Sequence, residues 1–241
     1  MPGKYYQNKL FPFQDDILQL IQNMKSAFYL TGGTALSRCY LNHRYSDDLD
    51  FFVNAHTNFK THCNKVIDRL KEVPDWHLEV GTVADTFVRL MMERQGVFLK
   101  VDFVNDVAFH WGGFEECSIY YRVDNWRNIL SNKLCALSRR DIKDIADILF
   151  IAQRYEFNWE DVFEEAKQKD LWVDPLKICR IIKEFPSELF HNIKWIAPVN
   201  IETLNVTAVK IHNDIFWGKT NSAVNIPLNP CSKLSSRVRR V

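Results

Sequence analysis

The segments Leu30-Thr31-Gly32-Gly33-Thr34 and Asp48-Leu49-Asp50-Phe51 carry the strongest structural signal in the sequence. An apolar run at residues 27–30 predicts a buried strand that ends at the glycine pair, and helical spacing resumes at Ala35. On a strand, Asp48 and Asp50 project to one side, while the apolar residues that alternate with them project to the other. The two segments therefore predict a strand–glycine–helix turn next to a strand that presents two adjacent carboxylates.

A later segment, Leu99-Lys100-Val101-Asp102-Phe103, offers a third carboxylate in the same way. Its apolar residues share one face, which leaves Asp102 on the opposite face. If this strand pairs beside the strand of Asp48 and Asp50, three carboxylates converge. Hard divalent cations prefer oxygen ligands, and two such ions can clamp the attacking and leaving oxygens in phosphoryl or nucleotidyl transfer. We therefore expect Asp48, Asp50 and Asp102 to form a two-ion Mg²⁺ site.

The glycine pair predicts a phosphate site beside these carboxylates. Because Gly32 and Gly33 lack a Cβ, the backbone N–H groups of the turn can approach a phosphate closely. The N-terminus of the following helix adds partial positive charge. We expect a nucleoside triphosphate to bind over Gly32, Gly33 and the adjacent Thr34.

The rest of the chain predicts an α+β protein in two parts. Helical spacing at residues 15–25 and 59–71 accompanies the two strands, and alternating apolar residues between 76 and 105 predict successive sheet strands, with an edge strand at 119–122. From residue 126 onward the pattern is helical nearly throughout, at 126–137, 142–154, 159–169, 175–183 and 204–216. We expect a mixed-sheet domain at 1–124 and a helical domain at 125–241 that ends in a basic tail.

Two ionisable residues of the helical part face its predicted interior. Lys133 falls in the middle of the apolar stripe of helix 126–137, where an ammonium group needs an anion such as a triphosphate. Asp144 lies between apolar residues around helix 142–154, whereas Asp147 lies at the margin of that face. A plainer interpretation of Lys133 and Asp144 is an interhelical ion pair, which is compatible with a catalytic role.

These residues resemble the AbiEii/AbiGii-type nucleotidyltransferases of the abortive-infection toxin family, the toxin half of type IV toxin–antitoxin systems. The resemblance rests on residues 30–36 and on His43-Arg44-Tyr45-Ser46-Asp47-Asp48-Leu49-Asp50-Phe51. In the helical part the family has a Lys, an Ala-Leu pair, Arg residues and an Asp-x-x-Asp helix, which match Lys133, Ala136-Leu137, Arg139-Arg140 and residues 144–147. The family belongs to the polymerase-β-like superfamily, so the resemblance implies a nucleotidyltransferase fold, with residues 1–124 as its catalytic domain.

The resemblance also implies an activity and a role for each residue. The enzyme would transfer a nucleoside monophosphate from a nucleoside triphosphate to an acceptor, with Mg²⁺, or alternatively Mn²⁺, as its ion. Asp48 and Asp50 would hold the ions, and Asp102 would bind the second ion and help to deprotonate the acceptor hydroxyl. Lys133 would neutralise triphosphate charge, and Asp144 would orient Lys133 or the acceptor. The implied acceptor is an RNA 3′ end, tRNA included, and the implied partner is a cognate antitoxin.

Alternatives remain open at the level of the sequence. Arg44 either binds nucleotide phosphate through its bidentate guanidinium or, with His43, holds the helix after the glycine pair against the D-x-D strand. The chain as a whole could be a non-catalytic module that binds nucleotide or a partner protein on the same fold. A D-x-D motif also binds Mn²⁺ and nucleotide sugars in glycosyltransferases, but the glycine pair and Asp102 count against that class.

Composition and charge exclude several classes of protein. With 46% apolar residues and a formal charge of +1, the chain is neither disordered nor basic throughout, as a protein that coats nucleic acid would be. The six cysteines form no C-x-x-C pair, which argues against a structural zinc site. No run approaches the roughly 20 apolar residues of a membrane helix. We expect a cytoplasmic protein with reduced thiols and no membrane partner.

Overall fold

The computed structural model describes residues 2–224 and shows a mixed β-sheet with helices, which confirms the α+β class. The strand order in the described chain is β3-β4-β5-β2-β1-β7-β6. β2 is parallel to β5 and antiparallel to β1, and β1 is in turn parallel to β7. The strands are β1 (Tyr29–Thr31), β2 (Asp48–Asn54), β3 (His77–Val83), β4 (Phe87–Arg94), β5 (Val97–Asp106), β6 (Glu115–Cys117) and β7 (Tyr120–Val123).

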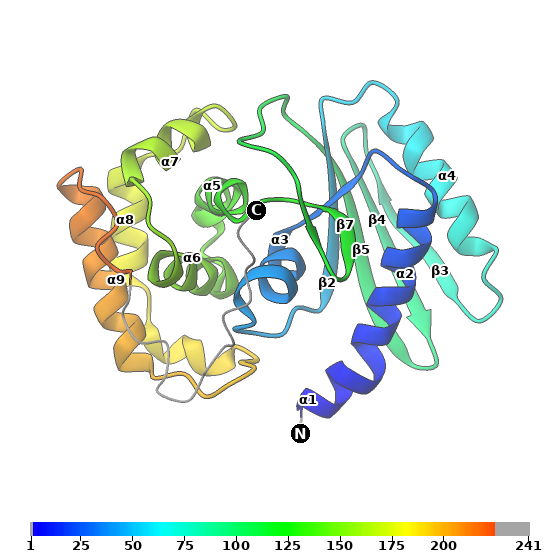
Figure 1. Cartoon of the computed structure of the whole chain (residues 1–241), viewed down its shortest axis with the longest axis horizontal. Helices are drawn as coiled ribbons and strands as arrows, with labels where there is room; N and C mark the ends of the chain where they lie inside the picture. The colour runs from blue at the N-terminus through cyan, green and yellow to red at the C-terminus, as the bar shows by residue number, and fades with distance from the viewer. Residues whose placement is uncertain (1, 225–241) are drawn as a thin grey trace.

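The described helices fall into two groups. The first accompanies the sheet: α1 (Pro2–Tyr5), the π-helical η1 (Tyr6–Leu10), α2 (Phe11–Asn23), α3 (Gly32–Ala35), the π-helical η2 (Leu36–Leu41) and α4 (Phe59–Lys71). The second, the helical group, is α5 (Trp126–Ala136), the 3-10 helix η3 (Leu137–Arg139), α6 (Ile142–Arg154), α7 (Trp159–Lys167), α8 (Pro175–Glu184), the 3-10 helix η4 (Ser187–Asn192) and α9 (Ile201–Phe216). The helical group lies on one side of the sheet, and α2 and α4 lie on the other (Figure 1).

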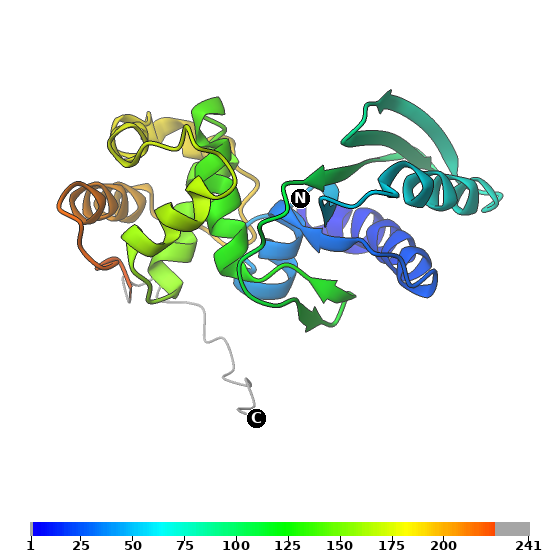
Figure 2. The same cartoon turned by 90° about the horizontal axis from the view of Figure 1, so that it is seen from above.

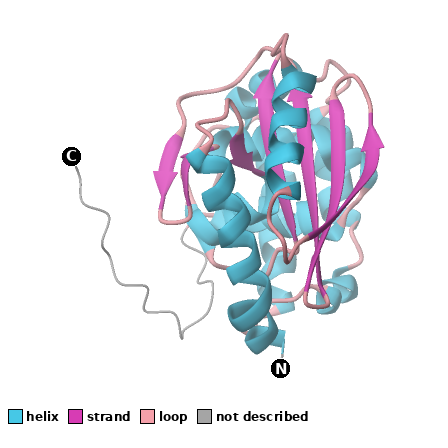
Figure 3. Ribbon diagram, turned by 90° about the vertical axis from the view of Figure 1, so that its right-hand side faces the viewer, coloured by secondary structure: helices cyan, strands magenta, loops and turns pink. Residues whose placement is uncertain are grey.

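The apolar face of the sheet packs against α2 and α4. The ring of Phe51 on β2 stacks on that of Phe103 on β5, with centroids 5.4 Å apart, and the ring of Phe28 meets Phe59 of α4 edge-on at 6.2 Å. Figure 3 views the sheet from the side of these helices, and Figure 2 shows the helical group apart from them. Because the side chains of β2 alternate, burial of this face turns Asp48 and Asp50 toward the helical group.

The loop between η2 and β2, residues 42–47, joins the sheet to the helical group. The backbone N–H of Tyr45 donates to the carbonyl of Lys194 at 2.8 Å, and the N–H of Ile196 donates to the carbonyl of His43 at 3.0 Å. Buried side chains of both parts belong to one continuous cluster. The loop that precedes the D-x-D strand is therefore fixed by the segment after η4.

Most predicted elements are present with small shifts at their ends, but two features differ. β6 lies between the predicted sheet strands and the predicted edge strand, where no strand is expected, and it forms an antiparallel pair with β7. Cys39 in η2 and Cys117 in β6 form a disulfide with Cα atoms 5.7 Å apart, so the expectation that all thiols are reduced is wrong. η2 is also tied to the residue after β7, because the hydroxyl of Tyr40 donates to the carbonyl of Asp124 at 2.8 Å.

Two expectations concern the periphery of the chain. Most of the basic tail, including Lys233, Arg237, Arg239 and Arg240, lies outside the described residues. Between residues 2 and 224, no helix combines the length and the apolar character needed to cross a membrane.

Candidate active site

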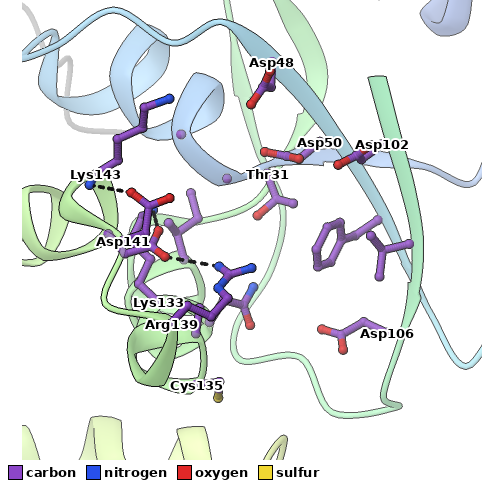
Figure 4. A pocket seen from close by; sticks show the side chains of 18 of the residues that line it. Thr31, Asp48, Asp50, Asp102, Asp106, Lys133, Cys135, Arg139, Asp141 and Lys143 are labelled. Carbon is purple, nitrogen blue, oxygen red and sulfur yellow. Dashed lines mark hydrogen bonds and ion pairs between the residues drawn. The ribbon is translucent and has the colours of Figure 1, made fainter. Parts of the chain in front are cut away.

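A cavity of about 990 Å³ opens between the carboxylate face of the sheet and the helical group. Gly32, Gly33, Asp48, Asp50 and Asp102 line its sheet side, and residues of α5 and of the α5–α6 connection line the opposite wall. Figure 4 shows the three carboxylates together on the sheet side, facing Lys133, Arg139, Asp141 and Lys143.

Strand register brings the three carboxylates together. Asp50 on β2 lies directly opposite Asp102 on the parallel strand β5, and Thr31 at the end of β1 lies on the other side of Asp50. Asp48 is two residues before Asp50 and shares its face. The convergence expected from the sequence therefore follows from the pairing of β2 with β5.

Two cations that the sequence analysis did not assign to the site contact these carboxylates. The Nζ of Lys100 lies 3.0 Å from Asp48 Oδ2 and 3.6 Å from Asp102 Oδ2. The guanidinium of Arg89 donates to both carboxylate oxygens of Asp102 at 2.8 Å. Alternation within β5 could have placed Lys100 on the face of Asp102, but Arg89 needs the β4–β5 register, which sets it opposite Asp102.

The carboxylate of Asp50 is electrostatically crowded. Burial and the charges of Asp102 and Asp48 raise its pKa to about 6, against a smaller opposing effect of Lys100. Within residues 2–224, no three His, Cys, Asp or Glu side chains are gathered in the arrangement of a metal site, and Lys100 and Arg89 stand among the carboxylates instead. The donor set still suits a hard divalent cation, because it consists of carboxylate oxygens whose mutual repulsion such an ion would relieve.

The glycine pair permits a close approach between the turn and its neighbours. Gly32 has φ +68°, and a Cβ at this position would lie 2.2 Å from Asp50 Oδ2. A Cβ on Gly33 would lie 2.7 Å from Arg44 Nη2. Thr34 is fully buried and its hydroxyl donates to the carbonyl of Asp48, so that side chain is not available to a nucleotide. The glycines thus hold the turn against the D-x-D strand while their backbone lines the cavity.

A buried carboxylate, Asp147, organises the other wall. Its oxygens accept from Arg44 Nε and Nη2 at 2.7 Å, lie 2.6 Å from Lys133 Nζ and contact His43 Nε2 at 2.7 Å. Arg44 and Lys133 lower the pKa of Asp147 well below its usual value and outweigh the opposing effect of burial. The expectation that Asp147 lies at the margin of α6 is wrong, because η2 and the loop after it cover this side of the helix.

The contacts of Arg44 bear on its two interpretations. Its Nε and Nη2 are bound to Asp147, and its Nη1 donates to the carbonyl of Tyr45 at 3.1 Å. The side chain is 3% exposed, so its bidentate edge is occupied by a carboxylate within the protein. The geometry therefore favours a positioning role for Arg44 over direct phosphate binding, although the residue borders the cavity.

Lys133 and Asp144 face the interior, as the helical pattern predicts. The Nζ of Lys133 lies 2.9 Å from Asp144 Oδ1, and Arg139 donates to the other oxygen of Asp144 at 3.1 Å. Burial opposes the charge of Lys133, but the carboxylates of Asp147 and Asp144 raise its pKa, so the ammonium group stays charged. A permanent cation therefore faces the three carboxylates of the sheet across the cavity (Figure 4).

Comparison with known proteins agrees with this geometry. Residues 20–194 match the family model described as nucleotidyl transferase AbiEii toxin, type IV TA system. MenT4, a nucleotidyltransferase toxin of Mycobacterium tuberculosis H37Rv, is similar in structure at 17% identity and a TM-score of 0.59, covering 86% of this chain and 82% of its own. JHP933 of Helicobacter pylori is similar at 23% identity and a TM-score of 0.52, covering 85% and 92%. No curated protein sequence matches the chain significantly.

The structural likenesses establish the fold, and the family model spans most of the chain. The chain is a nucleotidyltransferase and belongs to the AbiEii toxin family of type IV toxin–antitoxin systems.

Proposed function

We propose that this enzyme transfers a nucleoside monophosphate from a nucleoside triphosphate to an RNA 3′ end, tRNA included, in a Mg²⁺-dependent reaction. The observation that carries the proposal is the placement of Asp48, Asp50 and Asp102 on paired strands next to the Gly32-Gly33 turn. Such a set provides oxygen ligands and a phosphate cradle within one cavity.

Different residues of the cavity have different roles in the proposed reaction. Asp48, Asp50 and Asp102 would hold Mg²⁺, which when bound supplies charge neutralisation for the reacting phosphate and the acceptor oxygen. The backbone of Gly32 and Gly33 supports the triphosphate. Lys133 faces it with a positive charge that Asp144 and Asp147 hold in place.

The acceptor hydroxyl needs a group that removes its proton. We assign this role to Asp102, whose carboxylate is held by Arg89 and Lys100 on the cavity floor. The same two cations neutralise the carboxylates before nucleotide and ion bind. Replacement of Mg²⁺ by Mn²⁺ should leave the reaction operative, because both ions accept the same oxygen ligands.

Membership of the toxin family supports a biological role and a partner. We propose that the transfer inactivates an RNA that the cell needs for growth, and that a cognate antitoxin protein counteracts the enzyme. The proposed location is the cytoplasm, where nucleoside triphosphates and tRNA meet.

The test incubates the purified protein with Mg²⁺, each α-³²P-labelled nucleoside triphosphate and total RNA. The double variant Asp48→Ala, Asp50→Ala removes two metal ligands. A matched control, Asp68→Ala with Asp75→Ala, removes the same charge from exposed positions in α4 and the loop after it. We expect label on RNA with the wild type and the control, and none with the Asp48/Asp50 variant.

Two results would contradict this proposal. Label on the protein itself would replace RNA by a protein acceptor. Intact nucleotide binding without any transfer would favour the alternative of a non-catalytic module that binds nucleotide or a partner.

A further inference from the structure

The cavity extends beyond the residues assigned to the triphosphate and the ions. On the sheet face, three successive rows of side chains follow from the register of β4, β5 and β2. The first row is Arg89, Asp102 and Asp50; the second is Phe87, Val104 and Phe52; and Asp106 follows on β5. All of these side chains line the cavity. An apolar strip therefore separates the catalytic carboxylates from a second polar region.

Asp106 marks the far end of this region. It lies four residues beyond Asp102 on the same face of β5, which is about 13 Å along the strand at roughly 3.3 Å per residue. Figure 4 shows Asp106 and Cys135 at the end of the pocket away from Asp48 and Asp50. A nucleotide whose α-phosphate lies at Asp50 and Asp102 would place its ribose and base over the apolar strip.

The helical wall opposite Asp106 carries hydrogen-bond donors. The Nζ of Lys169, which follows α7, contacts Asn132 Oδ1 at 2.6 Å, Asn128 Oδ1 at 2.6 Å and Ser131 Oγ at 2.7 Å. All three partners are neutral, and no carboxylate between residues 2 and 224 lies within ion-pair distance of Lys169. Lys169 and Asn132 both line the cavity.

Asn132 has an unused donor. Its amide oxygen accepts from Lys169, which fixes the orientation of the amide group, and its Nδ2 finds no acceptor in the described part of the chain. A buried donor without a partner costs free energy that a ligand acceptor would recover. Asn132 is also the residue before Lys133 on α5, and both line the cavity.

We propose that this end of the cavity binds the nucleobase of the nucleoside triphosphate, and that Asn132 and Lys169 determine which base is preferred. The proposal rests on the proposed function, since it takes the triphosphate position from it. The apolar strip of Phe87, Val104 and Phe52 supports the face of the base. Asn132 donates from its unused Nδ2 to an acceptor on the edge of the base, and Lys169 holds that amide in place through its oxygen. Asp106 accepts from N–H groups of the base.

A selective polar edge gives large discrimination, because a base with the wrong edge leaves buried groups unpaired. The expected preference for one of the four nucleoside triphosphates over the least favoured is therefore at least tenfold. Inorganic tripolyphosphate, which has no base, should bind more weakly than the preferred nucleotide by a similar or larger factor.

The test measures equilibrium binding of ATP, CTP, GTP, UTP and inorganic tripolyphosphate to the full chain with Mg²⁺. Asn132→Leu removes the amide at nearly constant volume, and Lys169→Met removes the ammonium group. The matched control is Lys167→Met, which deletes an equal charge two residues away on α7, where the side chain pairs with Glu164 outside the cavity. Thermal unfolding of each variant reports its stability separately.

We expect both cavity variants to weaken the preferred nucleotide at least tenfold, to flatten the preference among bases and to leave tripolyphosphate binding within twofold of wild type. Equal binding of tripolyphosphate and all nucleotides by the wild type would overturn the base site but leave the phosphate site standing. Equal loss of every ligand in the variants, with a lower unfolding temperature, would reduce Asn132 and Lys169 to a structural clamp between α5 and α7. Failure of the wild type to bind any of the five ligands would overturn the proposed function as well.

Discussion

Asp147 holds the wall of the cavity opposite the sheet together through its ion pairs. Its carboxylate is fully buried and neutralises Arg44 and Lys133 together. Asp147→Asn would leave both cations buried without this partner, and breaking such a pair costs about 3 to 5 kcal/mol. We expect the free energy of unfolding, measured in urea, to fall by that amount.

Asp144→Asn is the matched control for Asp147→Asn. After that change Lys133 keeps Asp147, and Arg139, which is 69% exposed, can turn to water. The loss of stability should be clearly smaller than in Asp147→Asn, although nucleotidyl transfer should fall because Lys133 loses the negative charge of Asp144 that orients it. Equal loss of stability in the two variants would contradict the role given to Asp147.

His43 makes the same cluster sensitive to acid. Burial lowers the pKa of His43 below its usual value of 6.5, and Arg44 and Lys133 act in the same direction against the hydrogen bond that His43 donates to Asp147 and the charge of that carboxylate. Below about pH 6.5 the unfolded chain gains a proton that the folded chain resists, so stability falls as pH decreases. Between pH 7.5 and 5.5 the loss from this group reaches up to about 1.4 kcal/mol.

The measurement compares urea unfolding of wild type and His43→Gln at both pH values. Other groups, including Asp50, titrate equally in the two proteins, so the difference between them isolates His43. The variant should lose less stability on acidification than the wild type. An identical pH dependence in both would contradict this, because it would show that folding leaves the pKa of His43 unchanged.

At the scale of elements, the turn from β1 into α3 depends on Gly32. Gly32→Ala places a Cβ where Asp50 Oδ2 now lies and also strains a backbone with φ +68°. The expected result is displacement of the Asp50 carboxylate and loss of most nucleotidyl transfer, measured with labelled nucleotide and RNA.

Gly96→Ala separates the two effects of that change. Gly96 in the β4–β5 turn has φ +75° with nothing within 4 Å of an added Cβ, so its replacement introduces only the backbone strain, about 1 to 2 kcal/mol. Both variants should lose stability by that order, but only Gly32→Ala should lose activity. Full activity of Gly32→Ala would refute the close approach to Asp50 as the reason for this glycine.

Elements whose own residues follow a repeating apolar pattern were predictable from the sequence. Elements that form only by pairing with another strand were not. Helix α4 spans Phe59–Lys71 as its apolar spacing predicts, because an amphipathic helix has an apolar residue on its buried face every three to four residues. β6 is three residues long and exists because β7 lies beside it, so no pattern within it reveals a strand. Whether an element could be predicted therefore depended on the length of its repeating sequence pattern more than on the stability of the element.

At the scale of the whole molecule, the residues of the candidate site also fall into those that the sequence could predict and those that it could not. Asp48, Asp50 and Asp102 were accessible from alternation within single strands. Arg89 and the partners of Asp147 depend on strand register and on how α6 packs against the loop at 42–47, which are tertiary facts. The residues proposed to hold the ions were therefore easier to anticipate than the residues that hold the walls of the cavity in place.

The packing between the sheet and the helical group leads to a final prediction about the whole chain. The loop at 42–47 places His43 and Arg44 on Asp147 of α6, and one cluster of buried side chains continues through both parts. Separate unfolding of the two parts would break these contacts and expose the apolar surface between the parts to water. We therefore expect a single cooperative transition in urea.

Far-ultraviolet circular dichroism and tryptophan fluorescence should report the same midpoint, because one transition moves all probes together. A fragment of residues 1–124 lacks Asp147 and the backbone partners of Tyr45 and His43 in segment 194–196, and should therefore show no cooperative unfolding of its own. A fragment that unfolds cooperatively, together with two separated midpoints in the full chain, would instead establish residues 1–124 as an independent domain and reduce the Asp147 cluster to a contact between domains.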